Sequence, residues 1–429
     1  MSTGSTTGGR THACQETPED NTDHSQPPPP LCFDIGVEIA ERLQDATTII
    51  RCVSSICDPL LRRAILGDGF RRHLSSRAAA NGGFDPGLLL GFSYILHENG
   101  RRRFVHAPPA RFDESLLDTF TPAASRDGLL LLTKTSPSRD SPYQKEFLEL
   151  IVCNTLTGET ISPPPLEITK QAFTYPPALL AVANDAGAGC SFEVIVVEKC
   201  LSIHTYKSTR GNKWVNARGR TAHRWPTAHV DGTSAAVTGR AVHWLCYCNY
   251  DYQPNSGEES AVVFSVDADT AIATLTNLPE GCFGRDTGAY GVEGIHLAGA
   301  SSPSDGSLRL VAVGLHEISV WTLTPASPEA SPISRRRRWS KRAMIRVEEG
   351  IGNSLFGESW KPIRMRFECG RMCPAMRVMG FAERSGVGLV WMEGCGLVRF
   401  SLATAELAVV HRCAGEVDFG RSSLVRVLA

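Results

Sequence analysis

The chain has 429 residues, of which 42% are hydrophobic and 21% charged, a composition that supports a folded core and excludes a wholly disordered protein. Its 44 Lys and Arg residues nearly balance its 45 Asp and Glu residues, so no overall charge drives it onto nucleic acid or an anionic membrane. No apolar run approaches the roughly 18 residues that a membrane-spanning helix needs. We therefore expect a globular protein without a membrane or nucleic-acid partner.

Residues 1–30 are rich in Ser, Thr, Gly and Pro and end in four consecutive prolines. They contain no apolar core of the kind found in secretory signals, and they predict a disordered tail. The 14 cysteines are dispersed, and several of them, such as Cys153 and Cys246, lie in apolar runs. Such cysteines are typical of buried, reduced thiols. Together these features predict a cytoplasmic and/or nuclear protein.

Residues 31–74 have a helical period. Apolar residues recur at intervals of three or four, which places them on one face of a helix. The pattern predicts three short helices near residues 34–43, 46–57 and 59–66, followed by a linker over residues 75–87. The apolar positions of this segment include Leu31, Ile35, Ile39, Leu43, Ile49, Val53 and Leu60.

From residue 88 onward the helical period is replaced by short runs of β-branched, aromatic and leucine residues, separated by clusters of Gly, Pro, Asp, Asn and Ser. These runs predict a mainly-β domain over residues 88–429, built as a sandwich, barrel or propeller. The clearest runs are residues 88–96, 129–133, 147–153, 192–197, 235–247, 261–266, 308–313, 318–323, 387–392 and 397–402.

A weak internal repeat favours the propeller. An apolar strand, a polar turn with Thr or Asp, and a further strand recur at residues 150–159, 263–270 and 398–406, with copies spaced about 50 to 80 residues apart. This spacing suits one four-stranded blade per copy and predicts an irregular, kelch-like propeller of about five or six blades. A pair of irregular β-sandwiches is the alternative. With the helices, the fold class is α+β.

The helical segment resembles an F-box. It begins at Leu31, its first helix ends in Arg42-Leu43, its second leads to a cysteine, and a basic tail follows at Arg62-Arg63. It departs from the family where Cys32 replaces the usual proline and where Leu60 replaces a common tryptophan. The resemblance implies that the three helices dock on a Skp-family adaptor. The implied contact residues are Leu31, Ile35, Ile39, Leu43, Ile49, Val53 and Leu60. The alternative is that these helices only cap the β domain.

Residues 122–131, 153–159, 241–245 and 385–387 are similar to the β domain associated with plant F-boxes. The combined resemblance implies a substrate receptor of an SCF-type ubiquitin ligase, joined through the adaptor to a cullin scaffold, whose β domain holds an unknown target protein. Ubiquitin transfer would then be done by other subunits. A propeller scaffold without ligase function and a propeller enzyme are the alternatives.

The sequence contains no catalytic signature such as Gly-x-Ser-x-Gly, His-Glu-x-x-His or a P-loop. Its cysteine pairs lack the second pair that a zinc site needs, and single histidines such as His204, His243 and His296 are typical of structural hydrogen bonding. We therefore expect no catalytic residue, no metal and no cofactor. The run Arg335, Arg336, Arg337 and Arg338 predicts an exposed loop that is an import signal, a patch for an acidic partner, or simply solvated.

Overall fold

The chain is seen in a computed structural model that describes residues 91–98, 101–106, 113–126, 128–137, 145–155, 158–169, 175–182, 191–198, 201–221, 228–229, 234–248, 260–279, 282, 295–299, 307–313, 317–324, 338–346, 376–383, 385–392, 396–411 and 425–428, together with residues 38, 42, 43, 48 and 76. This part of the chain is mainly β, with a short 3-10 helix at Glu114–Asp118. None of the helices among the described residues is long and apolar enough to cross a membrane.

Little of the predicted F-box falls within the described residues. Glu38, Arg42 and Thr48 are helical, and Arg42 donates a hydrogen bond to Glu38 one turn earlier. Both of these charged side chains are exposed, as expected for the outer face of an amphipathic helix. The tail over residues 1–30 and most of residues 31–74 lie outside the described residues, so the three-helix module stays a prediction.

Five sheets of four or more strands follow each other along the chain, and we number them as blades 1 to 5. Blade 1 contains β3 (Thr121–Arg126), β4 (Leu129–Pro137), β5 (Lys145–Asn154), β6 (Thr160–Ile161) and β7 (Leu166–Thr169). Blade 2 contains β8 (Ala178–Val182), β9 (Ser191–Val197), β10 (Ser202–Lys207) and β11 (Trp214–Arg218). Blade 3 contains β14 (Ala236–Thr238), β15 (Ala241–Cys248), β16 (Ser260–Asp267) and β17 (Ile272–Asn277), with β12 (Arg220–Thr221) and β13 (Ala228–His229) at its edges.

Blade 4 contains β18 (Ile295–Ala298), β19 (Leu308–Val313), β20 (Glu317–Thr324) and β21 (Arg338–Arg346). Blade 5 contains β22 (Met376–Ala382), β23 (Val387–Met392), β24 (Gly396–Ser401) and β25 (Glu406–His411). A sixth, three-stranded sheet has the order β2 (Arg101–His106), β1 (Gly91–Glu98) and β26 (Val425–Leu428), and we call it the closing sheet. It pairs a strand near the start of the described β domain with a strand near its end.

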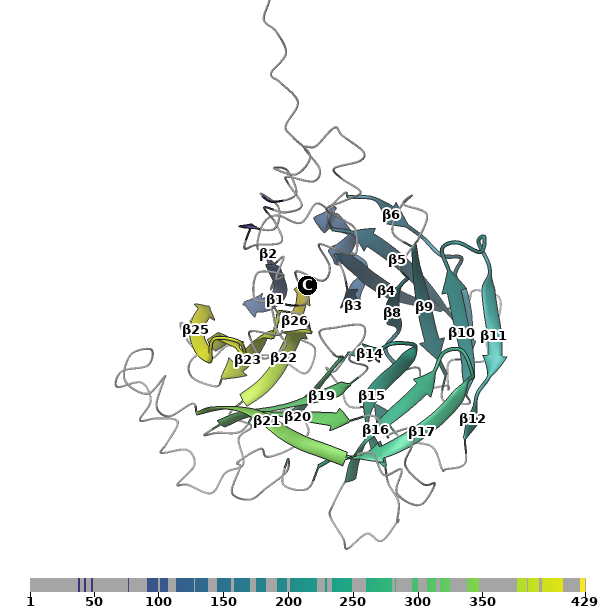
Figure 1. Cartoon of the computed structure of the whole chain (residues 1–429). Helices are drawn as coiled ribbons and strands as arrows, with labels where there is room; N and C mark the ends of the chain where they lie inside the picture. The colour runs from purple at the N-terminus through teal and green to yellow at the C-terminus, as the bar shows by residue number, and fades with distance from the viewer. Residues whose placement is uncertain are drawn as a thin grey trace, which may run out of the picture.

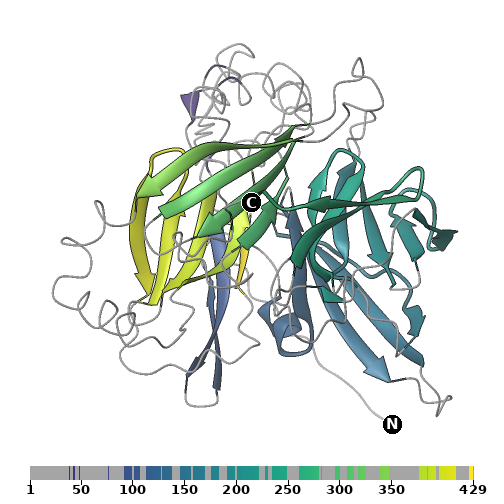
Figure 2. The ribbon, with the colours of Figure 1, turned by 90° about the horizontal axis from the view of Figure 1, so that it is seen from below.

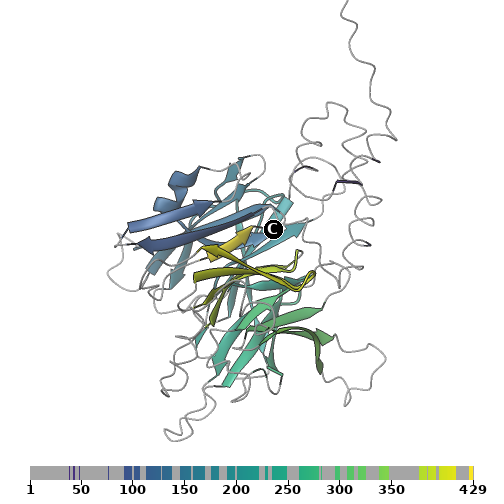
Figure 3. The same ribbon diagram turned by 90° about the vertical axis from the view of Figure 1, so that its left-hand side faces the viewer.

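The six sheets form a closed ring, which defines a β-propeller (Figure 1). The inner strands β3, β8, β14, β18 and β22 contact one another in succession, and β26 of the closing sheet contacts both β22 and β3. In Figure 1 the label for the C-terminus lies beside β26 near the centre of the ring. Figure 3, seen from the side of blade 5, shows the blue strands early in the chain above that blade and the green strands of blade 4 below it.

The core of the protein lies between neighbouring blades rather than at a single centre. One apolar cluster joins blades 1 and 2, a second joins blades 2 and 3, a third joins blades 3 and 4, and a fourth joins blades 4 and 5. The second cluster holds Trp244, whose ring packs against those of Tyr175 and Phe264 with centroids 5.4 and 5.8 Å away. Each middle strand therefore packs both of its faces against neighbouring blades. Figure 2 shows the ring from below, with the yellow strands of blade 5 at the left and the teal strands of blades 2 and 3 at the right.

Most of the predicted strand runs are confirmed, and one is wrong in detail. The run at residues 235–247 is a hairpin of β14 and β15 rather than one strand, because the chain turns at Gly239, which has a φ of 56° that suits glycine. The three copies of the repeat coincide with the link between the third and fourth strands of blades 1, 3 and 5. Arg338, which was expected in a loop, begins β21. Arg335 to Arg337 lie outside the described residues.

Candidate functional site

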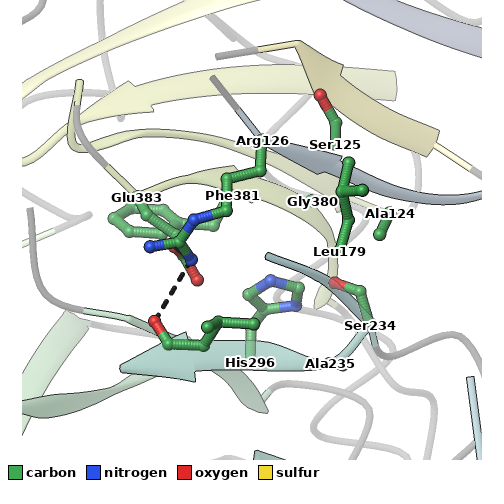
Figure 4. Close-up of a pocket in the computed structure, with 11 residues that line it drawn as sticks. Ala124, Ser125, Arg126, Leu179, Ser234, Ala235, His296, Gly380, Phe381 and Glu383 are labelled. Atoms are coloured by element: carbon green, nitrogen blue, oxygen red, sulfur yellow. Dashed lines mark hydrogen bonds and ion pairs between the residues drawn. The ribbon is translucent and has the colours of Figure 1, made fainter. Parts of the chain in front are cut away.

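A small cavity lies at the centre of the ring, where the inner strands of all five blades meet (Figure 4). Because these strands come from distant parts of the sequence, the cavity is a product of ring closure and not of any local motif. Its lining residues are Ala124, Ser125, Arg126, Leu179, Ser234, Ala235, Val237, His296, Gly380, Phe381 and Glu383.

An ion pair and two further hydrogen bonds cross one side of this cavity, and we call them the channel clamp. Arg126 Nη1, at the end of β3, lies 3.3 Å from Glu383 Oε2 and donates to the carbonyl oxygen of Val237 over 3.2 Å. The backbone N–H of Gly299 donates to Glu383 Oε1 over 2.6 Å. One carboxylate and one guanidinium thus connect blades 1, 3, 4 and 5 across the axis.

The clamp requires a glycine at position 299. A Cβ atom at that position would lie 2.2 Å from the carbonyl oxygen of Val237 and 2.9 Å from Glu383 Oε2. Both distances are far below van der Waals contact, and one of the atoms belongs to the backbone and cannot rotate away. Gly299 therefore permits the close approach of blades 3, 4 and 5 at the axis.

The cavity has a volume of about 40 Å³. One water needs about 10–15 Å³ of this kind of volume, so the cavity accommodates roughly three waters or one small ion. Ser125 Oγ is buried at its wall and has no hydrogen-bond partner among the described residues, so it is the polar atom that such a water would satisfy. This space is too small for a peptide segment.

The histidines inside the blades have structural hydrogen bonds, as the sequence predicts. In blade 2, His204 Nε2 lies 2.6 Å from Glu198 Oε1, and both residues are buried. In blade 3, His243 is held between two hydroxyls, with Nε2 2.7 Å from Thr238 Oγ1 and Nδ1 2.7 Å from Ser265 Oγ. Each network ties neighbouring strands of one blade together, whereas His296 lines the central cavity.

A charged network joins blades 2 and 3 at their surface. Arg240 donates to Glu193 over 2.8 Å and to Asp269 over 2.9 Å, and Lys207 lies 2.6 Å from the second oxygen of Glu193. Burial raises the pKa of Glu193, but hydrogen bonds from Arg240 and Lys207 outweigh this effect, and the pKa lies below its ordinary value. The hydrogen bond from Arg240 likewise lowers the pKa of Asp269. The network therefore fixes these carboxylates in the ionised form.

Within the described part of the chain, no three His, Cys, Asp or Glu side chains come together as a metal site. Cys153, Cys246 and Cys282 are buried thiols, which agrees with the expectation for the first two. Burial raises the pKa of Cys153 to about 11, so this thiol stays protonated near neutral pH.

The residues that the sequence predicts for adaptor binding are not brought together among the described residues. Leu43 alone of the seven is described, and it is partly buried; Leu31, Ile35, Ile39, Ile49, Val53 and Leu60 lie outside the described residues. The sequence gives no sign of the clamp, because Arg126 and Glu383 are single charged residues 257 positions apart.

The exposed large apolar side chains of the described residues all lie on outer strands. Ile161 of β6, Val215 of β11 and Ile272 of β17 are 42%, 53% and 50% exposed. Middle and inner strands bury their apolar side chains between blades. Exposed large apolar side chains among the described residues are therefore single residues on separate outer strands.

Closed ring topology makes this chain a β-propeller whose central channel is clamped and small. In sequence, residues 91–426 match the domain-of-unknown-function family DUF7595, which covers most of the chain. The protein belongs to this family. None of the curated proteins matches it in sequence.

Solved propeller-type structures resemble the chain only distantly. The WD40 domain of SCAP from fission yeast has 8% identity and a TM-score of 0.26, with 66% of each chain covered. The GH93 α-L-arabinofuranosidase of Fusarium graminearum has 10% identity and a TM-score of 0.30, covering 74% of this chain and 84% of that enzyme. Oligogalacturonate lyase from Vibrio parahaemolyticus has 9% identity and a TM-score of 0.28, covering 70% and 86%.

Proposed function

We propose that the chain is a non-catalytic substrate receptor of an SCF-type ubiquitin ligase. In this proposal the helical segment at residues 31–74 docks on a Skp-family adaptor and through it on a cullin scaffold, while the propeller binds a target protein. The expected cytoplasmic and/or nuclear location belongs to the same proposal. Ubiquitin transfer is assigned to other subunits.

One observation carries this proposal. Among the described residues, β1, β2 and β26 complete the ring as the closing sheet, so ring closure is accounted for without residues 31–74. An amphipathic segment of three short helices that is not needed for ring closure has an apolar face available to a partner. The F-box resemblance supports an adaptor as that partner.

The adaptor interaction can be tested with the full-length chain and a purified Skp-family adaptor. Replacing Ile39 and Leu43 together by aspartate places two charges on the apolar face and should abolish co-purification with the adaptor. The matched control replaces Glu38 and Arg42 by glutamine, since both side chains are exposed on the same helical segment. The control should bind the adaptor like the unmodified chain.

Two results would overturn the proposal. One is a failure of the folded, unmodified chain to bind the adaptor, which would leave a propeller scaffold without ligase function. The other is equal binding by the aspartate variant, which would remove the apolar face from the interface. The thermal unfolding temperature of every variant is measured alongside, to show that the propeller is intact.

A further inference from the structure

Strand β11 forms an open sheet edge on the outside of blade 2. It pairs with β10 on one side, and no described strand pairs with its other side. Figure 1 shows β11 at the rim of the ring. An unpaired edge presents a row of backbone N–H and C=O groups that an additional strand can bind.

The register identifies the backbone groups at this edge. Gly219 donates its N–H to the carbonyl of Leu201, so this residue pair belongs to the hydrogen-bonded set of the ladder between β10 and β11. Hydrogen-bonded and non-hydrogen-bonded pairs alternate in an antiparallel ladder. The N–H and C=O groups of Trp214, Asn216 and Arg218 therefore point away from β10 and toward solvent.

The edge is held in place before any partner arrives. Trp214 Nε1 donates to the carbonyl oxygen of Pro164 in blade 1 over 2.7 Å, and its ring lies 5.6 Å from that of Tyr206. Ser208, which follows β10, exchanges two hydrogen bonds with Phe192. A strand that is already fixed in an extended conformation lowers the entropy cost of adding another.

The chain segment that carries this edge is strongly basic. Residues 199–230 contain seven Lys and Arg residues and no Asp or Glu, in a chain whose overall charge is −1. Lys207 pairs with Glu193, but four exposed cations form no ion pair among the described residues. These four are Arg210, Lys213, Arg218 and Arg220.

We propose that β11 binds an extended, acidic segment of the target protein by strand addition. This inference deepens the receptor proposal and rests on it for the role of the bound segment. The outward backbone groups of Trp214, Asn216 and Arg218 bind the segment's main chain, and the unpaired cations bind its carboxylates. Val215, 53% exposed on β11, supplies an apolar contact for a side chain of the added strand.

The positive charge at β11 determines which kind of strand can pair with this edge. Like charges on an edge prevent it from pairing with a copy of itself, which protects the chain from aggregation. The same cations favour a strand that carries carboxylates at alternate positions. A nucleic acid would also satisfy the positive charge, but it has no ladder of N–H and C=O groups to match the edge.

The test uses the full-length chain and a fluorescein-labelled eight-residue peptide of alternating Val and Glu, with binding followed by fluorescence anisotropy. Its controls are the same peptide with Lys in place of Glu, the same peptide with Pro at a central position, and a single-stranded DNA oligonucleotide. The acidic peptide should bind, and neither control peptide should.

Three variants of the chain separate charge from strand addition. Lys213→Glu with Arg218→Glu should weaken binding by at least about tenfold. Asn216→Pro removes one outward N–H without removing a bond to β10, so it should weaken binding by a similar factor while the propeller stays folded. Arg338→Glu, an exposed arginine on the outer strand of blade 4, is the matched control and should change binding less than twofold.

Several outcomes would overturn the inference. They are equal binding by the charge-reversed variant, equal loss in Arg338→Glu, binding that survives Asn216→Pro, and capture of the oligonucleotide in place of the peptide. Adaptor binding is measured on the same preparations. If the chain binds the adaptor but not the peptide, strand addition alone is overturned. If it binds the peptide but not the adaptor, only the receptor role is overturned.

Discussion

Replacing Arg126 by methionine should loosen the ring, because this side chain connects blade 1 to blades 3 and 5. The change keeps the aliphatic stem and removes two hydrogen bonds, one to the carbonyl of Val237 at 3.2 Å and one to Glu383 at 3.3 Å. Both bonds have the charged guanidinium as their donor, and a hydrogen bond of a charged group contributes about 1.5–3 kcal/mol. The Arg126 and Glu383 side chains are 19% and 24% exposed, so each bond falls at the low end of that range.

The expected loss of unfolding free energy for the two bonds together is therefore about 3 kcal/mol. Urea unfolding followed by tryptophan fluorescence measures it, because several tryptophans lie at blade interfaces. The matched control is Lys134→Met, which removes an ion pair with Glu149 at 3.9 Å whose side chains are 37% and 35% exposed. A pair of that kind contributes about 0–1 kcal/mol.

A double-mutant cycle with Glu383→Gln isolates the contact itself. Removal of either partner leaves the other without its charge complement, so the two changes should couple by about 1 kcal/mol. The reasoning is refuted if Arg126→Met costs no more than Lys134→Met, or if the two clamp substitutions are additive. Either result would mean that the axis of the ring is held by the blade interfaces alone.

Three further changes test other parts of the structure. Gly388→Ala places a Cβ 2.2 Å from the ring of Phe400 and should cost about 1–3 kcal/mol in urea unfolding, whereas Gly239→Ala, at φ 56° in open space, should cost about 1 kcal/mol. The pKa of Glu193 is lower in the folded chain than in the unfolded chain. The ionised carboxylate therefore stabilises the folded chain above the ordinary carboxylate pKa, and this contribution is lost as the pH falls through the folded pKa. Arg240→Met should reduce the loss of unfolding free energy between pH 7 and pH 4. The folded pKa of Cys153 is raised to about 11, so stability should decline as the pH rises from 9 to 11, and Cys153→Ala should lessen that decline relative to the unmodified chain.

The sequence predicts the middle strands of the blades well and the inner strands poorly. Middle strands such as β9 and β19 are buried on both faces, so each appears in the sequence as a continuous apolar run. Inner strands such as β3 and β14 are short and rich in small residues, because they crowd around the axis of the ring. They leave no apolar run to recognise. For this reason the sequence predicts one strand over residues 235–247, where the structure has the two strands β14 and β15.

The sequence also leaves the channel clamp and the β11 edge unassigned, for different physical reasons. The clamp depends on ring closure, which brings Arg126 and Glu383 together from opposite ends of the domain. The β11 edge depends on which neighbour a strand lacks, and pairing is a property of the whole sheet. The basic composition of residues 199–230 was available, but an even overall charge conceals a local excess of this kind.

The proposed strand-addition site on this propeller depends on which strands still have unpaired backbone groups. Inner strands are packed against each other around a cavity of about 40 Å³, and middle strands bury both faces between blades. The large apolar side chains that are exposed among the described residues lie on outer strands, which also have the free sheet edges. Among them β17 is paired on its outer side by β12, and β6 has only two residues, whereas β11, β21 and β25 each have at least five residues and no described outer neighbour. Of these three, β11 carries an exposed large apolar side chain, Val215. Because Trp214 fixes β11 to blade 1, a strand added at β11 would be held against blades 1 and 2 at once.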